Sequence, residues 1–237
     1  MELSGALAVI TGATEGIGRA IAFQLGGAGA KLAICARTER NVRATVQELQ
    51  DAGIDAVGMP CDVSDPAGVD SFAAFATKQR GAPRVLVNNA GIGRFKPLSE
   101  LSLEDWDATM AVNVRSLFLM TRAFVAGMKD AGGGTIVNIA SLAGRNGFDG
   151  GTAYCASKHA VLGFSKALML EVRKHNIRVV AICPGSVATP FMDKQSRERP
   201  NRDRALAADD VAHVVVSSLT ASDRAMVSEL DIRPTNP

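Results

Sequence analysis

Short apolar runs alternate with amphipathic segments along this chain, and the alternation limits its possible folds more than any other feature. The runs are rich in Val, Ile and Ala and are mostly apolar on both faces, which is typical of parallel strands covered on both sides. We expect strands at Ala6–Thr11, Lys31–Ala36, Ala56–Pro60, Arg84–Asn88, Thr135–Ala140, Arg178–Cys183 and Met226–Ile232. Helices are expected near 17–29, 39–52, 66–79, 103–130, 152–174 and 208–219. The pattern predicts an α/β fold with a doubly wound, seven-stranded, mostly parallel sheet and helices on both faces.

The bulk composition excludes several classes of protein. A length of 237 residues fits one domain, 1–237, with a sizeable core. The net charge of +2 argues against a dedicated nucleic-acid binder, and no apolar run reaches the roughly 20 residues that a membrane span needs. No signal peptide is visible, and the scattered cysteines fit reduced thiols, so we expect a cytoplasmic protein. Neither the four cysteines nor the three histidines show metal-ligand spacing, and we expect no metal site.

The first expected strand runs into a glycine-rich turn and then a helix. The turn reads T-G-A-T-E-G-I-G over residues 11–18. Gly12 permits a tight turn, Gly16 lets the backbone approach a pyrophosphate, and Gly18 lets the helix pack closely on the strand. Phosphates would lie at the positive end of the helix, so the turn predicts a dinucleotide site.

The chain has a single tyrosine, Tyr154, four residues before Lys158 and thirteen after Ser141. Residues four apart share one face of a helix, so a phenol and an ammonium would face the same space. A free phenol has a pKa near 10. A cation about 4 Å away is worth roughly 4 kcal/mol at an effective dielectric near 20, which would lower that pKa by up to about 3 units before the cost of burial. We therefore expect Tyr154 to exchange protons near neutral pH.

Six motifs occur in order along the chain. They are T-G-x-x-x-G-x-G at residues 11–18, Asn88-Asn89-Ala90-Gly91, Asn113, Ser141, Tyr154-x-x-x-Lys158 and Pro184-Gly185. With these motifs the chain resembles the short-chain dehydrogenase/reductase family, in its compact one-domain type, from residue 6 to about 190. The resemblance implies a Rossmann-type fold and an oxidoreductase.

The resemblance also implies roles for four catalytic residues. Tyr154 would be the general acid/base, and Lys158 would lower its pKa and hold the nicotinamide ribose. Ser141 would hydrogen-bond the substrate oxygen, much as an oxyanion-hole donor does. Asn113, in the middle of a long helix, would hold a water that links Lys158 to solvent.

A wider set of residues is implied to bind the cofactor. Asp62, after the third strand, would bond the adenine, and Pro184 and Thr189 would border the nicotinamide carboxamide. The full set is Gly12, Thr14, Glu15, Gly16, Ile17, Gly18, Arg37, Asp62, Val63, Asn89, Ala90, Gly91, Tyr154, Lys158, Pro184, Gly185, Val187 and Thr189.

The choice of cofactor depends on the end of the second strand. NAD-dependent proteins commonly carry an acidic residue there for the ribose 2′-hydroxyl, but here Ala36 is followed by Arg37. A guanidinium can bind a 2′-phosphate through paired hydrogen bonds, which favours NADP over NAD. Glu15 stands where NADP-dependent relatives often carry a basic residue, so the phosphate would have a single clamp.

Apolar residues after Ser141 predict an apolar substrate pocket. Its expected lining is Phe95, Leu142, Gly144, Phe148, Phe191 and Met192, together with a substrate loop near 189–207. That loop carries Lys194, Arg197, Arg199, Arg202 and Arg204 among Glu198 and Asp203. It has two interpretations, a solvated loop or a docking segment for an acidic acyl carrier, and the first is favoured.

The resemblance is close to 3-oxoacyl-[acyl-carrier-protein] reductases, but their V-D-G-G-type ending is replaced by L-D-I-R-P-T over 230–235. That ending is more similar to general carbonyl or hydroxy-acid oxidoreductases. The leading hypothesis is an NADP-dependent oxidoreductase acting on a ketone or secondary alcohol, with a 3-oxoacyl thioester as one candidate. The alternatives are an NAD-dependent alcohol or hydroxy-acid dehydrogenase and a non-catalytic dinucleotide sensor. In this family helices at 103–130 and 152–174 form subunit contacts, which implies a homodimer or homotetramer.

Overall fold

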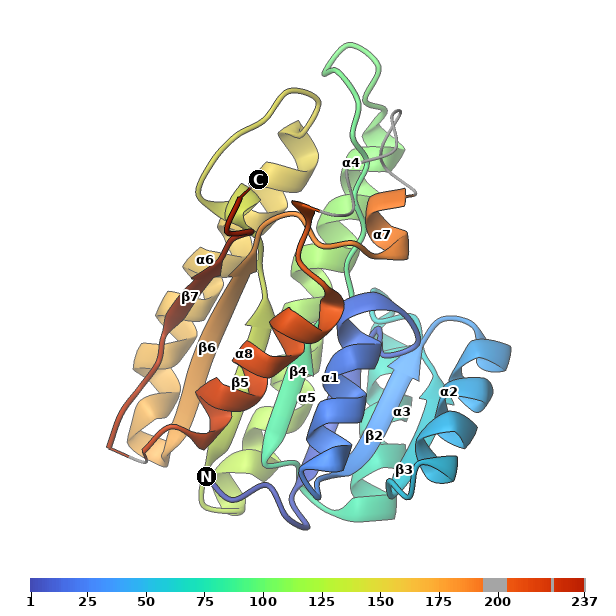
Figure 1. The fold of residues 1–237 in the computed structure, drawn as a ribbon, viewed down its shortest axis with the longest axis vertical. Helices are drawn as coiled ribbons and strands as arrows, with labels where there is room; N and C mark the ends of the chain where they lie inside the picture. Colours follow the sequence, from blue (N-terminus) through green and yellow to red (C-terminus); the bar gives the residue numbers. More distant parts are fainter. Residues whose placement is uncertain (194–203, 223, 237) are drawn as a thin grey trace.

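The structure, a computed structural model, describes residues 1–193, 204–222 and 224–236. In this part of the chain seven strands form one sheet in the order β3-β2-β1-β4-β5-β6-β7, and every neighbouring pair is parallel. The strands are β1 (Leu7–Thr11), β2 (Lys31–Ala36), β3 (Ala56–Pro60), β4 (Val85–Asn88), β5 (Gly134–Ile139), β6 (Ile177–Pro184) and β7 (Glu229–Ile232). The predicted doubly wound sheet is confirmed, and its expected strands differ from the observed ones mainly at their ends (Figure 1).

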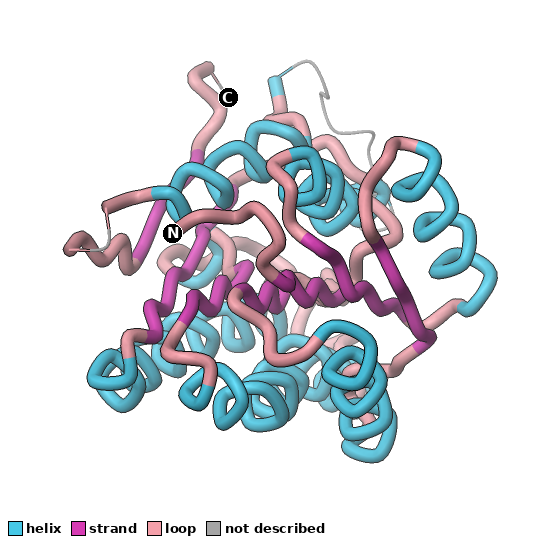
Figure 2. The backbone as a smooth tube through the Cα atoms, turned by 90° about the horizontal axis from the view of Figure 1, so that it is seen from below, coloured by secondary structure: helices cyan, strands magenta, loops and turns pink. Residues whose placement is uncertain are grey.

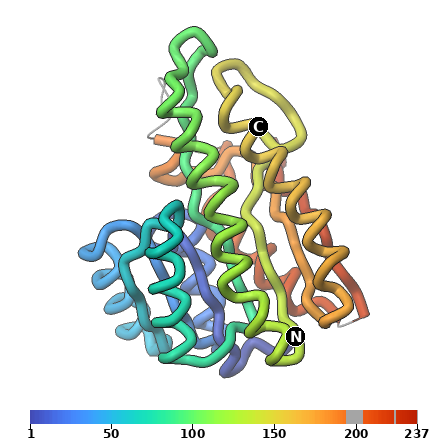
Figure 3. Tube along the Cα trace, turned by 180° about the vertical axis from the view of Figure 1, so that it is seen from behind, coloured from blue at the N-terminus to red at the C-terminus, as the bar shows by residue number. Residues whose placement is uncertain are grey.

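Helices cover both faces of the sheet, as the edge-on view in Figure 2 shows. One face carries α1 (Gly16–Gly27), α2 (Glu39–Asp51) and α8 (Ala208–Thr220). The other face, seen in Figure 3, carries α3 (Pro66–Arg80), α5 (Ser116–Asp130) and α6 (Thr152–Val172). Two shorter helices, α4 (Leu103–Met110) and α7 (Pro190–Asp193), lie toward the upper end of Figure 1. None of the described helices is both long enough and apolar enough to span a bilayer.

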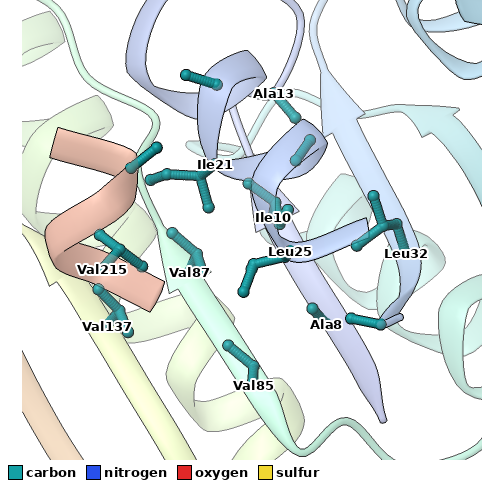
Figure 4. Packing of buried hydrophobic residues seen from close by; sticks show 14 of the residues in the cluster. Ala8, Ile10, Ala13, Ile21, Leu25, Leu32, Val85, Val87, Val137 and Val215 are labelled. Atoms are coloured by element: carbon teal, nitrogen blue, oxygen red, sulfur yellow. The ribbon is translucent and has the colours of Figure 1, made fainter. Parts of the chain in front are cut away.

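The core has one apolar layer on each side of the sheet. Ala8 and Ile10 of β1 join the layer with Ile21 of α1, whereas Leu7 and Val9 join the layer on the opposite face. Figure 4 shows the first layer, where side chains of α1 and α8 meet the central strands. Because neighbouring residues of a strand point to opposite faces, a strand buried on both faces must be apolar throughout.

Local signals in the sequence fix several helix ends. Asp65 caps α3, because its carboxylate accepts hydrogen bonds from the N–H groups of Ala67 and Gly68, and Pro66 occupies the first turn. After α5, Gly133 has φ 118° and lies so close to the backbone of Asn176 that a β-carbon would overlap it.

The helix expected over 103–130 is not continuous. Between α4 and α5 the residues Ala111–Arg115 form a π-helical turn with Asn113 at its centre. A π-helical turn shifts the hydrogen-bond register by one residue, and such turns occur frequently at functional sites. Apolar periodicity does not reveal the turn, since it changes the course of the helix only locally.

Candidate active site

A cavity of about 1250 Å³ opens at the carboxyl ends of the central strands. It lies where the sheet order reverses between β1 and β4, the place where ligands bind in open α/β sheets. At one end it is lined by the glycine-rich turn and the ends of β2 and β3. At the other end it is lined by Ser141, Tyr154 and Lys158.

The glycine-rich turn forms the first end of the cavity. Gly12 and Gly16 have φ values of 63° and 55°, a left-handed backbone that a residue with a β-carbon rarely adopts. The N–H of Gly12 donates to the carbonyl of Cys35 at 2.8 Å, which joins the turn to β2. Helix α1 begins at Gly16, and the side chain of the preceding Glu15 makes no cap hydrogen bond. The first N–H groups of a helix have no partner within it, so this turn can bind an anion.

Gly18, predicted to bind the cofactor, does not line the cavity. A β-carbon at this position would overlap the carbonyl oxygen of Gly12 and the side-chain amide of Asn89. Its place is the contact between helix and strand that the glycine-rich turn predicts, and its part in cofactor binding stays a prediction.

Two polar side chains hold the turn against β4. The amide of Asn89 donates to the carbonyls of Thr11 and Gly12, both at 3.0 Å. In return, the Thr11 hydroxyl accepts from the N–H groups of Asn89 and Ala90, also at 3.0 Å. The sequence reasoning gave Thr11 no role, although it begins the first motif. Asn88, the residue before Asn89, is buried in the sheet, where its amide donates to the side-chain oxygen of Asn138 at 2.9 Å.

Ser141, Tyr154 and Lys158 meet at the second end of the cavity. Tyr154 and Lys158 lie one turn apart on α6 and are both buried, while Ser141 follows β5 and hydrogen-bonds the Tyr154 side chain. The Lys158 ammonium donates to the carbonyl of Ile139 at 2.8 Å and lies 5.7 Å from the centre of the Tyr154 ring. The structure therefore brings together three of the four predicted catalytic side chains.

The pKa of Tyr154 moves in the opposite direction from the expected one. Burial raises it to about 12, although the hydrogen bond with Ser141 opposes that rise. Burial also lowers the pKa of Lys158 to about 8. We expected Lys158 to bring the pKa of the Tyr154 phenol close to neutral pH, and this expectation is not met in the structure. The cost of burying a charge exceeds the attraction between the two groups. At pH 7 the pair consists of a neutral phenol and a mostly protonated lysine.

Asn113, the fourth predicted catalytic residue, lies behind the cavity wall rather than in it. Its side-chain oxygen accepts from the N–H of Ile92 at 2.8 Å, and its amide donates to the carbonyl of Ile92 and to the hydroxyl of Ser157. The side chain therefore fixes the loop after β4 to α6. Its expected water-holding role stays a prediction, and Ser157 is a partner that the sequence reasoning missed.

Arg37 lies beside the end of β2 and lines the cavity with an exposed side chain. Asp62 lines the same end. Partial burial opposes ionisation of Asp62, but hydrogen bonds from Ser64 and the charges of Arg37 and Arg115 hold its pKa below the ordinary value. Thr38 and Asn41, at the start of α2, also line this end and were not predicted.

The remaining predicted residues divide between lining and support. The lining set comprises Thr14, Ile17, Val63, Ala90, Gly91, Phe95, Leu142, Phe148, Pro184, Gly185, Val187, Thr189, Phe191 and Met192. Gly144 is not part of it, since it packs against the Lys158 carbonyl, where a β-carbon would be 2.7 Å away. Arg204 lines the cavity, and the other charged residues expected in the loop, Lys194 to Asp203, lie outside the described residues.

One charged cluster near the site was not predicted at all. Arg145, four residues after Ser141, forms ion pairs with Glu229 at 2.5 Å and with Asp231 at 2.7 Å. These pairs tie the segment after β5 to β7, which comes almost ninety residues later. No local pattern marks such a contact, because its partners are defined only by the sheet order.

Comparisons with known proteins identify the family to which the chain belongs. A model of the short chain dehydrogenase family matches residues 6–200. A Streptomyces violaceoruber protein, provisionally named ketoacyl reductase 1 of the granaticin polyketide synthase, is 42% identical over 79% of this chain and 70% of its own length. A D-threitol dehydrogenase of Mycolicibacterium smegmatis is 42% identical over 81% of this chain and 74% of its own. The crystal structure of a metagenomic short-chain oxidoreductase in complex with NADP superposes with a TM-score of 0.87 over 100% of both chains, at 39% identity.

Proposed function

The chain belongs to the short-chain dehydrogenase/reductase family, and we propose that it is an NADP-dependent oxidoreductase that interconverts a ketone and a secondary alcohol. One observation carries the proposal. Ser141, Tyr154 and Lys158 meet in the same cavity whose opposite end is formed by the glycine-rich turn. A proton donor and a nucleotide site thus share one space.

The cavity fits a dinucleotide. Its volume of about 1250 Å³ exceeds the roughly 300–1000 Å³ of ordinary small-ligand pockets, which leaves room for a substrate beside the cofactor. The turn from Gly12 to Gly16 would hold the pyrophosphate, Arg37 the 2′-phosphate, and Asp62 the adenine end. NADPH, when bound, supplies the hydride that a carbonyl carbon accepts on reduction. The NADP in the similar metagenomic oxidoreductase supports this choice over NAD.

The proton reaches the carbonyl oxygen from Tyr154. A pKa of about 12 keeps the phenol protonated at neutral pH, so it is ready to act as an acid during reduction. Ser141 hydrogen-bonds that same phenol and would hold the substrate oxygen beside it. The Lys158 charge favours the phenolate that remains after transfer.

The class of ketone is the finer part of the proposal. The granaticin relative supports a 3-oxoacyl thioester, and the threitol dehydrogenase supports a small polyol. Both substrates contain a ketone or secondary alcohol, so the chemistry assigned to Tyr154 serves either of them.

Loss of absorbance at 340 nm tests the function. NADPH and NADH are each incubated with a panel that includes acyclic ketones, ring ketones and an acetoacetyl thioester of N-acetylcysteamine. We expect ketone-dependent oxidation of NADPH that is faster than that of NADH. Oxidation of neither cofactor with any ketone would refute the proposal, and the Tyr154→Phe protein gives the background rate.

We also propose that the protein assembles with copies of itself through α5 and α6. Two large apolar side chains on these helices are exposed to solvent in the single chain, Phe118 at 47% and Leu170 at 57%. Light scattering should give a dimer or a tetramer for the wild type. Substitution of both residues by Glu should give a monomer, and a wild-type monomer at micromolar concentration would contradict the assembly.

A further inference from the structure

Three phenylalanine rings surround Tyr154, and together they form what we call the aromatic cage: Phe95, Phe148 and Phe191. The ring centres of Phe95 and Phe191 lie 5.2 Å and 5.9 Å from that of Tyr154, and the centre of Phe148 lies 6.4 Å away. Phe95 also contacts both other rings of the cage, at 5.1 Å and 6.3 Å. All four aromatic residues line the cavity.

Two glycines make room for the cage. A β-carbon on Gly93 would stand 2.8 Å from the ring of Phe95 and 3.0 Å from that of Phe191. A β-carbon on Gly151 would stand 2.6 Å from the ring of Phe148. Neither glycine has a positive φ, so neither is required by the course of the backbone. The rings therefore pack directly against the backbone of these glycines, and a larger residue at either position would displace them from the wall of the cavity.

The cage is incompletely covered in the free chain. Phe148 keeps 45% of its surface exposed, while Tyr154 beside it is 9% exposed. An apolar ligand that covers an exposed ring gains about 25 cal/mol for each Å² of apolar surface removed from water. The exposed part of Phe148 thus offers binding energy next to the proton donor.

The chemistry of the cage selects among the ketones. Its rings offer no hydrogen-bond partner to a hydroxyl group, so a polyol would lose contacts with water and gain none from these side chains. Phe95 meets its three aromatic neighbours at interplanar angles of 72°, 73° and 85°, the edge-to-face arrangement that aromatic rings prefer. A planar aromatic ring can join such an array, whereas a saturated ring has no negative face or positive edge to match it.

We propose that the aromatic cage makes this enzyme selective for ketones that carry an aromatic ring one methylene group away from the carbonyl group. The inference rests on the proposed function, because the cage surrounds the residue that gives the proton. Phe95, Phe148 and Phe191 act as specificity-determining residues, and they disfavour small polyols and their ketoses.

A matched pair of substrates tests the inference. Phenylacetone and cyclohexylacetone share one carbon skeleton, and neither conjugates its carbonyl group with the ring, so their ketones have similar intrinsic reactivity. With the wild type and NADPH, we expect kcat/KM for phenylacetone to exceed that for cyclohexylacetone by at least about fivefold. Dihydroxyacetone should be the poorest of the three substrates. Equal values for the two ring ketones, or a preference for dihydroxyacetone, would overturn the inference.

Substitutions in the cage sharpen the test. Phe148→Leu and Phe191→Leu keep an apolar side chain but remove the aromatic face, so each should lower the phenyl-to-cyclohexyl ratio by at least about twofold. Phe75→Leu, on α3 and outside the cavity lining, is the matched control and should keep the wild-type ratio. If both cage variants kept the wild-type phenyl-to-cyclohexyl ratio, residues outside the cage would determine the selectivity, and the role of the rings would be refuted.

Binding without turnover separates this inference from the proposed function. The melting temperature of the protein with NADP is measured with increasing phenylacetone or cyclohexylacetone, since a ligand of the native state raises it. A larger rise with phenylacetone supports the cage even if no ketone is reduced, in which case only the proposed function fails. Equal rises refute the cage even if reduction proceeds.

Discussion

The two ends of the active-site cavity differ in whether main chain or side chains give them their shape. The end proposed to hold the cofactor, called the cofactor end, is organised by backbone, with the Gly12–Gly16 turn, the start of α1 and the ends of two strands. The end proposed to hold the substrate, called the substrate end, is organised by side chains from separate segments, namely Tyr154 and the rings of Phe95, Phe148 and Phe191. The shape of the first end depends on the backbone conformation of the turn. The shape of the second end depends on contacts between side chains that are distant in the sequence.

This difference predicts different sensitivities to mutation. Adding an atom to the cofactor end should disturb it, because backbone groups there have little room to move. Removing an atom from the substrate end should change its chemistry while leaving the fold in place. Each of the following experiments would either sharpen this contrast or break it.

The largest expected effect comes from one oxygen atom at the substrate end. Tyr154→Phe removes the proton donor and keeps the ring, so turnover of the best ketone should fall by about 10²–10⁴-fold. NADPH affinity and the urea midpoint of unfolding should stay close to wild type, which serves as the control for folding. Retention of more than half the wild-type activity would show that another group supplies the proton.

A stability experiment examines Lys158, which lies at the substrate end one helix turn from Tyr154. Burial gives it a pKa of about 8 in the folded chain, against an ordinary 10.5. Below pH 8 the lysine is protonated both folded and unfolded, so the full cost of the buried charge is present. Between about pH 8 and 10.5 the unfolded chain binds more protons, so the free energy of unfolding should rise with pH, by roughly 3 kcal/mol in total.

Lys158→Met should lack this rise. Urea unfolding of both proteins at pH 7, 9 and 10 measures it, and the titration of Tyr154 cancels because both proteins keep the tyrosine. Lys174→Met, which removes an exposed lysine, is the control and should follow the wild type. Parallel curves for wild type and Lys158→Met would mean that burial does not perturb the lysine.

At the cofactor end, Arg37 is the side chain expected to distinguish NADP from NAD. Arg37→Asp removes a charge-assisted contact worth roughly 1.5–3 kcal/mol and adds repulsion against a 2′-phosphate. The ratio of kcat/KM for NADPH to that for NADH should fall by at least about tenfold. Arg40→Asp is the matched control, since Arg40 is exposed and does not line the cavity. A wild-type preference for NADH would overturn the cofactor assignment but not the role of Tyr154.

The smallest expected effect concerns the packing of the backbone at the cofactor end. Gly18→Ala would bring a β-carbon into the space of Gly12 and Asn89, and such overpacking typically costs about 1–3 kcal/mol. Gly27→Ala, in the same helix with open space around it, should be neutral or up to about 1 kcal/mol stabilising. Urea unfolding and NADPH titration of both variants give the comparison. Equal stability of the two variants would show that the turn can move to accept a β-carbon. The proposed difference in sensitivity between the two ends of the cavity would then be wrong.

The glycine-rich turn could be predicted well, because its parts are neighbours in the chain. Gly12, Gly16 and α1 follow β1 within a few residues, so their spacing alone defines a turn and a helix start. Apolar runs such as Val85–Asn88 identified strands for the same local reason. The π-helical turn at Asn113 was missed because it alters the register of a helix without changing its apolar pattern.

The sequence by itself determined the alternation of strands and helices, the glycine-rich turn and the Tyr154–Lys158 pair, because each depends on residues close in the chain. The tertiary structure alone decided the ion pairs of Arg145 with β7, the amide of Asn89 across the turn, and the cage around Tyr154. It also decided the pKa of Tyr154, since desolvation depends on every segment packed around a group. Contacts between distant segments follow from the sheet order and the packing of loops, and no short stretch of sequence contains that information.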